Sequence, residues 1–227
     1  LEGLEDSELL MLDVRYCEKL IEINAKNNPN LTSLNLSNCI RLQRLDVSGC
    51  TRLGSTTGTP LDVGNCYNLK YLDISNTSVP ALTTTNCSYL THVNISKSLI
   101  SSINYAHLQS LKTVQINDCS RLTSVVIDSC QGITDLNIAN NPALREVRLD
   151  NCKKLRTIVV NNVQDLELFQ INNCESLKTI RIVKANSLKS IDLSGAEGLE
   201  TLDISTIPIE TITFGTISTL KNLDVSN

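Results

Sequence analysis

An eleven-residue period runs along almost the whole of this 227-residue chain and limits what it can fold into. The repeated pattern is L-x-x-L-x-[LIV]-x-x-[CN]-x-x, interrupted by one longer unit that begins at Leu53. Its fourth position is apolar in all twenty units, from Leu12 to Leu223, and its sixth position departs from apolar residues only at Thr84. One such unit is too short to enclose a core, so the units must stack and share one.

The spacing within each unit predicts a strand rather than a helix. The fourth and sixth positions are two residues apart and enclose a mostly polar residue, which is the alternation of a β-strand. Two units placed back to back form a flattened coil, and stacking such coils pairs each strand with its equivalent in the next coil, about 4.8 Å away. Twenty units therefore predict a single β-rich solenoid of about ten coils over residues 1–227, with an irregular loop at 53–60.

Both ends of the chain fall inside a unit. The chain begins at Leu1 in a partial repeat and stops at Asn227, the eighth position of a unit, and neither end carries a polar cap. A bare solenoid end exposes a strand edge and an open core, which is costly. We therefore expect this chain to be a segment of a larger protein, with flanking domains in the same chain.

The repeats resemble a known family. LTSLNLSNCIRLQRLDVSGC (31–50) and LKYLDISNTSVPAL (69–82) resemble leucine-rich repeats, and the coil of about 22 residues with its cysteine column is similar to the short-repeat, internalin-like group of bacterial surface proteins. The resemblance covers residues 9–227. It implies a right-handed superhelix, and protein recognition or adhesion through one strand-lined face. The repeat units themselves predict parallel strands on both faces and little helix. The two halves of each coil are more alike than in the family, where a strand alternates with a helix.

The net charge and the short apolar runs of the chain argue against two classes of partner, nucleic acids and the interior of a membrane. Twenty Lys and Arg against 24 Asp and Glu give a formal net charge of −4, which argues against a nucleic-acid partner. No apolar run has the roughly 18 to 20 residues needed for membrane insertion. The expected partner is a protein. The resemblance favours the cell surface, whereas unpaired cysteines leave the cytoplasm or an anaerobic setting open.

All nine cysteines occupy the ninth position of the unit, so they stack as columns: Cys17, Cys39, Cys50, Cys66, Cys87, Cys119, Cys130, Cys152 and Cys174. No C-x-x-C pair converges on a metal ion. Stacked coils bring equivalent Cα atoms near enough for a disulfide, but parallel side chains suit its geometry poorly. Structural free thiols are favoured over disulfides or metal ligation.

The sequence predicts no enzyme. His92 and His107 lack a nucleophile or metal partner at a useful spacing, and the glycines form no phosphate-binding loop. Asp46 and Asp73 fall at equivalent positions of neighbouring coils, and we interpret them as solvated carboxylates rather than an acid–base pair. No catalytic, cofactor or metal site is expected.

The two faces of the solenoid differ in their outward positions. Units beginning at Leu9, Leu31 and onward form a first set, in which these positions are mostly small, and units beginning at Leu20, Leu42 and onward form a second set, in which they vary. Varied side chains are what a recognition surface needs. The candidate partner-binding residues, all in the second set, are Arg44, Tyr71, Asp73, His92, Asn94, Gln115, Asp135, Asn137, Arg156, Lys178 and Arg181.

Charge varies along the predicted axis. Residues 145–189 hold nine basic and five acidic side chains. Either these charges keep the surface solvated, or they form a local site for an acidic partner. The sequence thus favours a non-enzymatic recognition module. The alternative, if no face binds a partner, is a structural spacer in a large assembly such as a phage or virion.

Overall fold

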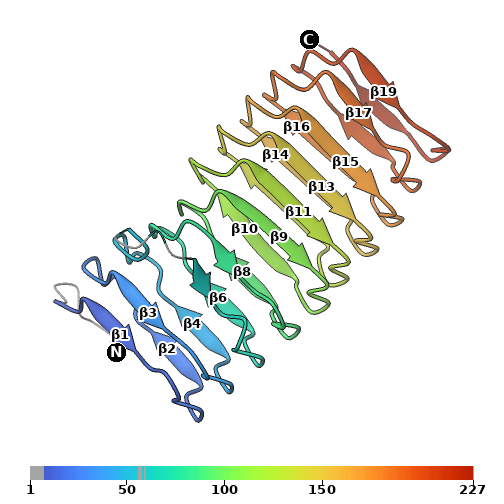
Figure 1. Cartoon of the computed structure of the whole chain (residues 1–227). Helices are drawn as coiled ribbons and strands as arrows, with labels where there is room; N and C mark the ends of the chain where they lie inside the picture. The colour runs from blue at the N-terminus through green and yellow to red at the C-terminus, as the bar shows by residue number, and fades with distance from the viewer. Residues whose placement is uncertain (1–7, 56–57, 59, 227) are drawn as a thin grey trace.

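The chain folds into a stack of flat coils with its two ends at opposite ends of the stack (Figure 1). The computed structural model describes residues 8–55, 58 and 60–226. These residues form twenty short strands and no helix, so none of them forms a membrane-spanning helix. Each predicted unit contributes one strand, and the predicted solenoid of about ten coils is confirmed.

The second set of units forms one continuous, parallel, ten-stranded sheet, called here the second-set sheet. Equivalent residues pair across it; Leu45, for example, pairs with Leu72, and Leu136 pairs with Ile158. Its strands are β2 (Glu22–Asn24), β4 (Arg44–Asp46), β6 (Tyr71–Asp73), β8 (His92–Asn94), β10 (Thr113–Asn117), β12 (Asp135–Ala139), β14 (Thr157–Asn161), β16 (Thr179–Val183), β18 (Thr201–Asp203) and β20 (Asn222–Asp224).

The first set of units forms three separate parallel sheets instead of one. One sheet pairs β1 with β3, the next pairs β5 with β7, and a six-stranded sheet runs from β9 to β19. The strands are β1 (Met11–Asp13), β3 (Ser33–Asn35), β5 (Leu61–Asp62), β7 (Leu82–Thr83), β9 (Ser102–Ala106), β11 (Ser124–Asp128), β13 (Glu146–Asp150), β15 (Leu168–Asn172), β17 (Ser190–Asp192) and β19 (Thr211–Thr213).

The first of these breaks, between β3 and β5, coincides with the longer unit. Of the loop predicted at 53–60, residues 56, 57 and 59 lie outside the described residues, whereas 51–55 form turns. Leu53 is buried and Gly54 has a φ of 85°, a left-handed conformation that favours glycine. The second break, between β7 and β9, coincides with Thr84 and Tyr105, which occupy the sixth position of these two units.

The turns explain the asparagines of the repeat. The eighth position takes a left-handed conformation in unit after unit, for example a φ of 63° at Asn38 and 54° at Asn151. Asparagine tolerates this conformation better than most residues, because its short polar side chain bonds locally. The exposed asparagines also bond along the stack: Asn162 Nδ2 donates to Asn140 Oδ1 at 2.9 Å, and Asn140 Nδ2 donates to Asp118 Oδ1 at 3.0 Å.

The cysteine column has a hydrogen-bonding role. All nine thiols are free, eight are buried, and Cys17 is exposed. Cys50 Sγ donates to the carbonyl oxygen of Ala25 at 3.1 Å, and Cys119 Sγ donates to that of Ile95 at 3.2 Å, each in the preceding coil. Asn141 occupies the same position, and its Nδ2 donates to the Ile116 carbonyl oxygen at 2.8 Å. The ninth position therefore takes small donors that satisfy buried carbonyls, whose unpaired burial would be costly.

Tyr105 stands in the core at the sixth position of its unit, where the repeat usually has Leu, Ile or Val. Its side chain is fully buried, and its hydroxyl has no hydrogen-bond partner in the part of the chain that the structure describes. Burial also raises its pKa, so the hydroxyl stays protonated. A buried hydroxyl without a partner costs about 1 to 3 kcal/mol.

We expect Tyr105→Phe to raise the free energy of unfolding by about 1 kcal/mol, because it removes the unpaired hydroxyl and keeps the ring. Urea titration followed by circular dichroism measures the change. Tyr89→Phe, at a side chain that is 57% exposed, is the matched control and should change nothing. A loss of stability in Tyr105→Phe would mean that the hydroxyl is satisfied, for example by a buried water.

Candidate functional site

All eleven candidate partner-binding residues lie on the second-set sheet or directly before one of its strands. Nine of them lie within strands β4, β6, β8, β10, β12 and β16. Arg156 and Lys178 are the residues immediately before β14 and β16. Their strands pair in register, so these side chains occupy adjacent rungs of one surface.

Three side chains on β4, β6 and β8 stack against one another. Arg44 Cζ lies 3.7 Å from the centroid of the Tyr71 ring, and the centroids of the Tyr71 and His92 rings are 6.2 Å apart with the planes tilted by 35°. Arg44 Nε also lies 3.2 Å from a carboxylate oxygen of Glu22 on β2. His92 is exposed, whereas Arg44 and Tyr71 are half-buried. The Arg44–Tyr71–His92 stack is thus a fixed group of planar side chains on three neighbouring strands.

The buried carboxylate of Asp73 holds Tyr71 of this stack in place. Tyr71 Oη donates to Asp73 Oδ2 at 3.4 Å, and Asn94 Nδ2 donates to the same oxygen at 3.1 Å. Burial, followed by the charge of Asp73, raises the pKa of Tyr71, which keeps its hydroxyl a donor. Because its carboxylate accepts both of these hydrogen bonds, Asp73 positions Tyr71 and Asn94 rather than contacting a partner directly.

The interpretation of Asp46 and Asp73 as solvated carboxylates was wrong. Their exposed fractions are only 7% and 9%. Each closes a turn by accepting from a serine two residues later, with Ser48 Oγ 2.7 Å from Asp46 Oδ1 and Ser75 Oγ 2.6 Å from Asp73 Oδ1. Arg44 and Tyr71, which lie on the same strands, cover the two carboxylates. The alternation of polar and apolar residues in the sequence does not predict this covering by neighbouring side chains.

Farther along the same sheet the surface is hollowed. A hollow of about 400 Å³ lies over β10, β12 and β14 and is lined by Gln115, Asp135 and Asn137. A second hollow, of about 360 Å³, includes Arg181 and extends toward β18. Val159 lines both, so the two hollows meet in the middle of the sheet.

Of the basic candidate residues Arg156, Lys178 and Arg181, the last two are paired with acids of the next coil. Arg181 Nε donates to Asp203 Oδ2 at 2.8 Å, and Lys178 Nζ donates to Glu200 Oε1 at 2.6 Å. Hydrogen bonds from Lys178 and from Lys221 lower the pKa of Glu200 to about 2, so this carboxylate is charged at neutral pH. Arg156 has no ion pair among residues 8–55, 58 and 60–226. The charge available to an acidic partner is therefore smaller than the sequence count implies.

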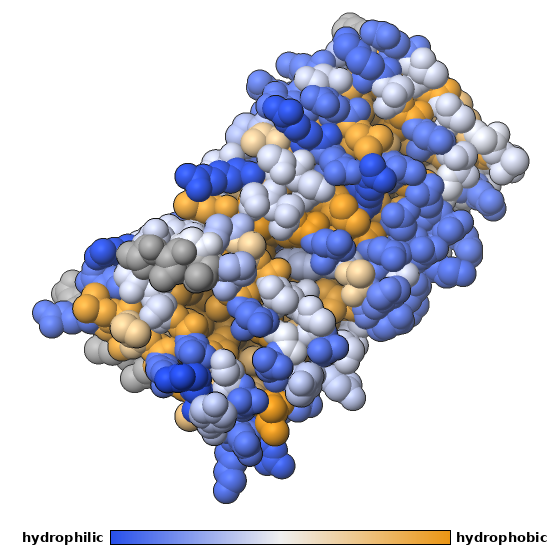
Figure 2. Space-filling view, in the orientation of Figure 1, coloured by the Kyte–Doolittle hydropathy of each residue, from blue (hydrophilic) through white to orange (hydrophobic). Residues whose placement is uncertain are grey.

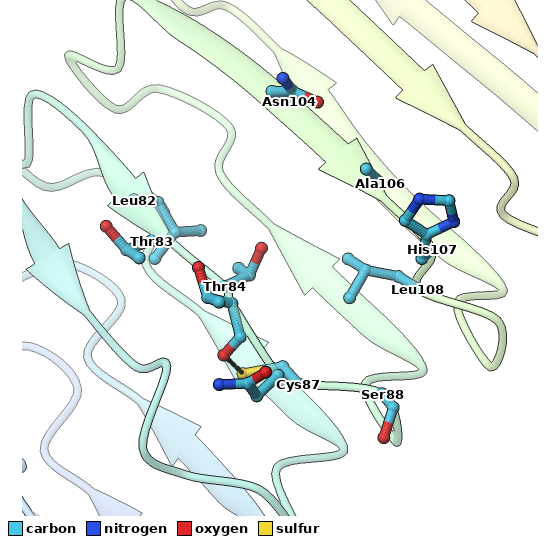
Figure 3. A pocket seen from close by; sticks show the side chains of 11 residues that line it. Leu82, Thr83, Thr84, Cys87, Ser88, Asn104, Ala106, His107 and Leu108 are labelled. Atoms are coloured by element: carbon cyan, nitrogen blue, oxygen red, sulfur yellow. Dashed lines mark hydrogen bonds between the residues drawn. The ribbon is translucent and has the colours of Figure 1, made fainter.

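A cavity of about 600 Å³ lies on the opposite face, where β7 and β9 do not pair. Figure 3 shows Asn104 and Ala106 of β9, and His107 directly after this strand, across the cavity from Leu82 and Thr83 of β7. Three residues of its lining stand out in the sequence, namely Thr84 as a polar residue at an interior position, Cys87 and His107, but the sequence does not indicate a cavity between them.

Cys87 and His107 line this cavity without forming a reactive pair. Cys87 Sγ donates to the Val63 carbonyl oxygen at 3.3 Å, and burial raises its pKa to about 11. A nucleophilic cysteine needs a lowered pKa, so this thiol is poorly suited to attack. No group of three or more His, Cys, Asp or Glu side chains converges on a metal position within the described residues.

Residues 149–227 match the family model described as the leucine-rich repeat domain of the endo-beta-N-acetylglucosaminidase EndoS. A comparison with curated protein sequences finds no significant match.

Three solved structures are similar to this chain at low sequence identity. The functional domain of InlJ from Listeria monocytogenes, which includes a cysteine ladder, is 18% identical over 85% of this chain and 47% of its own, with a TM-score of 0.44. The receptor in a TLR13–ssRNA13 complex is 16% identical over 92% of this chain and 44% of its own, with a TM-score of 0.31. The plant peptide hormone receptor RGFR1, in complex with RGF2, is 12% identical over 96% of this chain and 58% of its own, with a TM-score of 0.25.

This chain therefore spans 44–58% of the length of these similar structures. The eleven-residue pattern and the stacked parallel coils are those of a leucine-rich repeat superhelix, and residues 149–227 are similar to a leucine-rich repeat family model.

Proposed function

We propose that this chain is a non-enzymatic recognition module that binds a protein partner through the second-set sheet. The Arg44–Tyr71–His92 stack carries the proposal, because arginine and tyrosine dominate binding energy at protein interfaces when their side chains are held in place. Each member sits on a strand paired on both sides, and Glu22 and Asp73 hold two of them further. Preorganisation of this kind lowers the entropy lost on binding.

The extent of the sheet supports the same face. Ten strands pair without a break on the second-set side, whereas the first-set side is divided into three sheets. Figure 2 shows one face of the molecule, on which hydrophilic side chains are interspersed with apolar ones along the stack. We further propose that the solenoid is one segment of a larger bacterial surface protein with an adhesive role, as the resemblance to internalin-like repeats implies.

Site-specific photo-cross-linking tests the proposed face. A photoreactive amino acid at position 94 or 137 on the second-set sheet, or at position 104 or 126 on the first-set side, is exposed to the surface proteins of the source organism. We expect positions 94 and 137 to give one shared cross-linked protein, identified by mass spectrometry, and positions 104 and 126 to give none.

Competition makes the test specific. Unlabelled wild-type chain should suppress the cross-link, and the variant Arg44→Ala/Tyr71→Ala/His92→Ala should need at least about tenfold more protein to do so, because hot-spot truncations each cost about 1 to 2 kcal/mol. Thermal unfolding of the variant serves as the folding control. Equal competition by both proteins would reject this stack as the site, and the lack of any shared cross-link would favour the spacer function.

A further inference from the structure

A row of positive side chains runs along one border of the second-set sheet, at the second position of its units. The backbone of these residues forms a hydrogen-bond ladder, in which Lys112 N donates to the Thr91 carbonyl oxygen at 2.9 Å and Lys178 N donates to that of Arg156 at 2.9 Å. Equivalent residues are therefore stacked one per coil. The cationic members, called here the basic row, are Lys70, Lys112, Arg156, Lys178 and Lys221.

The spacing of the basic row follows from the stack. Lys70, Lys112 and Arg156 precede β6, β10 and β14, so they occupy every second coil. With strands about 4.8 Å apart, their positions repeat at about 9.6 Å. The coils between them contribute the neutral Thr91 and Thr134. The result is a single file of charges parallel to the solenoid axis.

Two cations in the middle of the basic row are available to a partner. Lys112 and Arg156 are exposed, and neither has an ion pair or side-chain hydrogen bond within the described part of the chain. Lys178 and Lys221 share the carboxylate of Glu200, with both Nζ–oxygen distances at 2.6 Å. In the coil between the free pair, Asp135 follows Thr134, and its carboxylate accepts from Thr134 Oγ1 at 2.8 Å.

We propose that the basic row binds an extended acidic polypeptide segment of the partner, lying along the solenoid axis. The inference rests on the proposed function, since it assigns a chemistry to the protein partner of this sheet. A chain in the polyproline II conformation advances about 3.1 Å per residue, so an acidic residue at every third position recurs at about 9.3 Å. That repeat matches cations placed on every second coil.

The surroundings favour a polypeptide over an acidic polysaccharide. Strands β10, β12, β14 and β16 of the second-set sheet carry no aromatic side chain on which a sugar ring could stack. The adjoining hollow, where Val159 is partly exposed, instead offers apolar contact to peptide side chains between the acidic ones. A row with one cation every second coil also neutralises too few phosphates to suit a nucleic acid.

Fluorescence anisotropy with a defined probe tests the basic row. The probe is a labelled 15-residue peptide with five repeats of Glu-Pro-Ser, and the same peptide with Gln for Glu is its uncharged control. We expect the Glu peptide to bind at low salt and the Gln peptide to bind at least about tenfold more weakly, because the attraction is between charges.

Charge reversal locates the binding. Lys112→Glu/Arg156→Glu should weaken binding of the Glu peptide by at least about tenfold, since two attractive contacts become repulsive. The matched control is Arg121→Glu/Arg145→Glu, which makes the same change in net charge at two exposed residues bordering the first-set side, and it should keep wild-type affinity. Equal losses in both variants would reduce the effect to net charge and overturn the proposal.

The other outcomes also decide between hypotheses. If the wild-type chain ignores the Glu peptide but binds an oligogalacturonate through Lys112 and Arg156, the ligand is an acidic polysaccharide and the peptide assignment is wrong. If it binds neither, the basic row is not a polyanion site. Neither result changes the photo-cross-linking test, which decides the proposed function without either probe.

Discussion

Replacing Leu136 by Asp should unfold the middle of the solenoid. Leu136 is 2% exposed and lies in β12, where it pairs with Ile158 of the next coil. A carboxylate at this position loses its hydration without gaining a partner, and the apolar contacts of the leucine are lost as well. The expected loss is about 4 kcal/mol or more, which is a large part of the 5 to 15 kcal/mol that stabilises a typical domain. Urea titration followed by circular dichroism measures it.

The adjacent residue supplies the control. Asn137→Asp introduces the same charge one position along β12, on an exposed side chain, and should change the stability by no more than about 0.5 kcal/mol. Because repeat proteins unfold through neighbouring units, Leu136→Asp should also abolish binding to the second-set sheet. Equal stability of the two variants would contradict the assignment of the fourth position to the core.

The repeat period predicts nearly all of the fold because it encodes which side of each strand is buried. The fourth-position residues Leu45, Leu136 and Phe169 are all buried, and alternation with period two fixes their direction. The two breaks in the first-set side were not predicted. They depend on how Thr84, Tyr105 and the longer unit fit between coils, and side-chain volume across coils is not visible in a one-dimensional pattern.

The sequence predicts that the candidate residues share one sheet, but it does not predict the contacts between them. Outward positions of the second set identify the residues on the sheet, yet the pattern cannot show that Arg44 covers Tyr71 or that Glu200 joins Lys178 to Lys221. Such contacts link residues about two units apart in the sequence, and they depend on rotamers rather than on position. The same limit explains the error at Asp46 and Asp73.

Raising the pH from 8 to 10 should destabilise the solenoid through its buried cysteines. Burial raises the pKa of Cys66 and Cys130 to about 12 and that of Cys87 to about 11, from an ordinary value of 9.0. The unfolded chain releases these protons above pH 9, whereas the folded chain retains them. Their contribution to stability is therefore complete below pH 9 and is lost as the pH rises toward 11 to 12.

The size of the effect follows from the linkage between protonation and folding. Each buried thiol weakens folding by about 1.4 kcal/mol for each pH unit above the pKa of the unfolded thiol, so three thiols give a loss of about 4 kcal/mol at pH 10. Urea titrations at pH 8 and pH 10 measure the difference. Alkylation of the denatured chain without reductant should first count nine free thiols, and only Cys17, which is exposed, should react quickly in the folded chain.

The variant Cys66→Ala/Cys87→Ala/Cys130→Ala separates thiol ionisation from other alkaline effects. Its stability at pH 8 will be lower, because the thiols of Cys87 and Cys130 donate to backbone carbonyl oxygens of the preceding coil. The informative quantity is the change in the free energy of unfolding between pH 8 and pH 10. In this variant the change should be smaller than in the wild type by most of the expected value of about 4 kcal/mol. An unchanged difference would assign the alkaline loss to lysine and tyrosine side chains at the surface. In that case the thiols would not be held in their neutral form by the stacked coils.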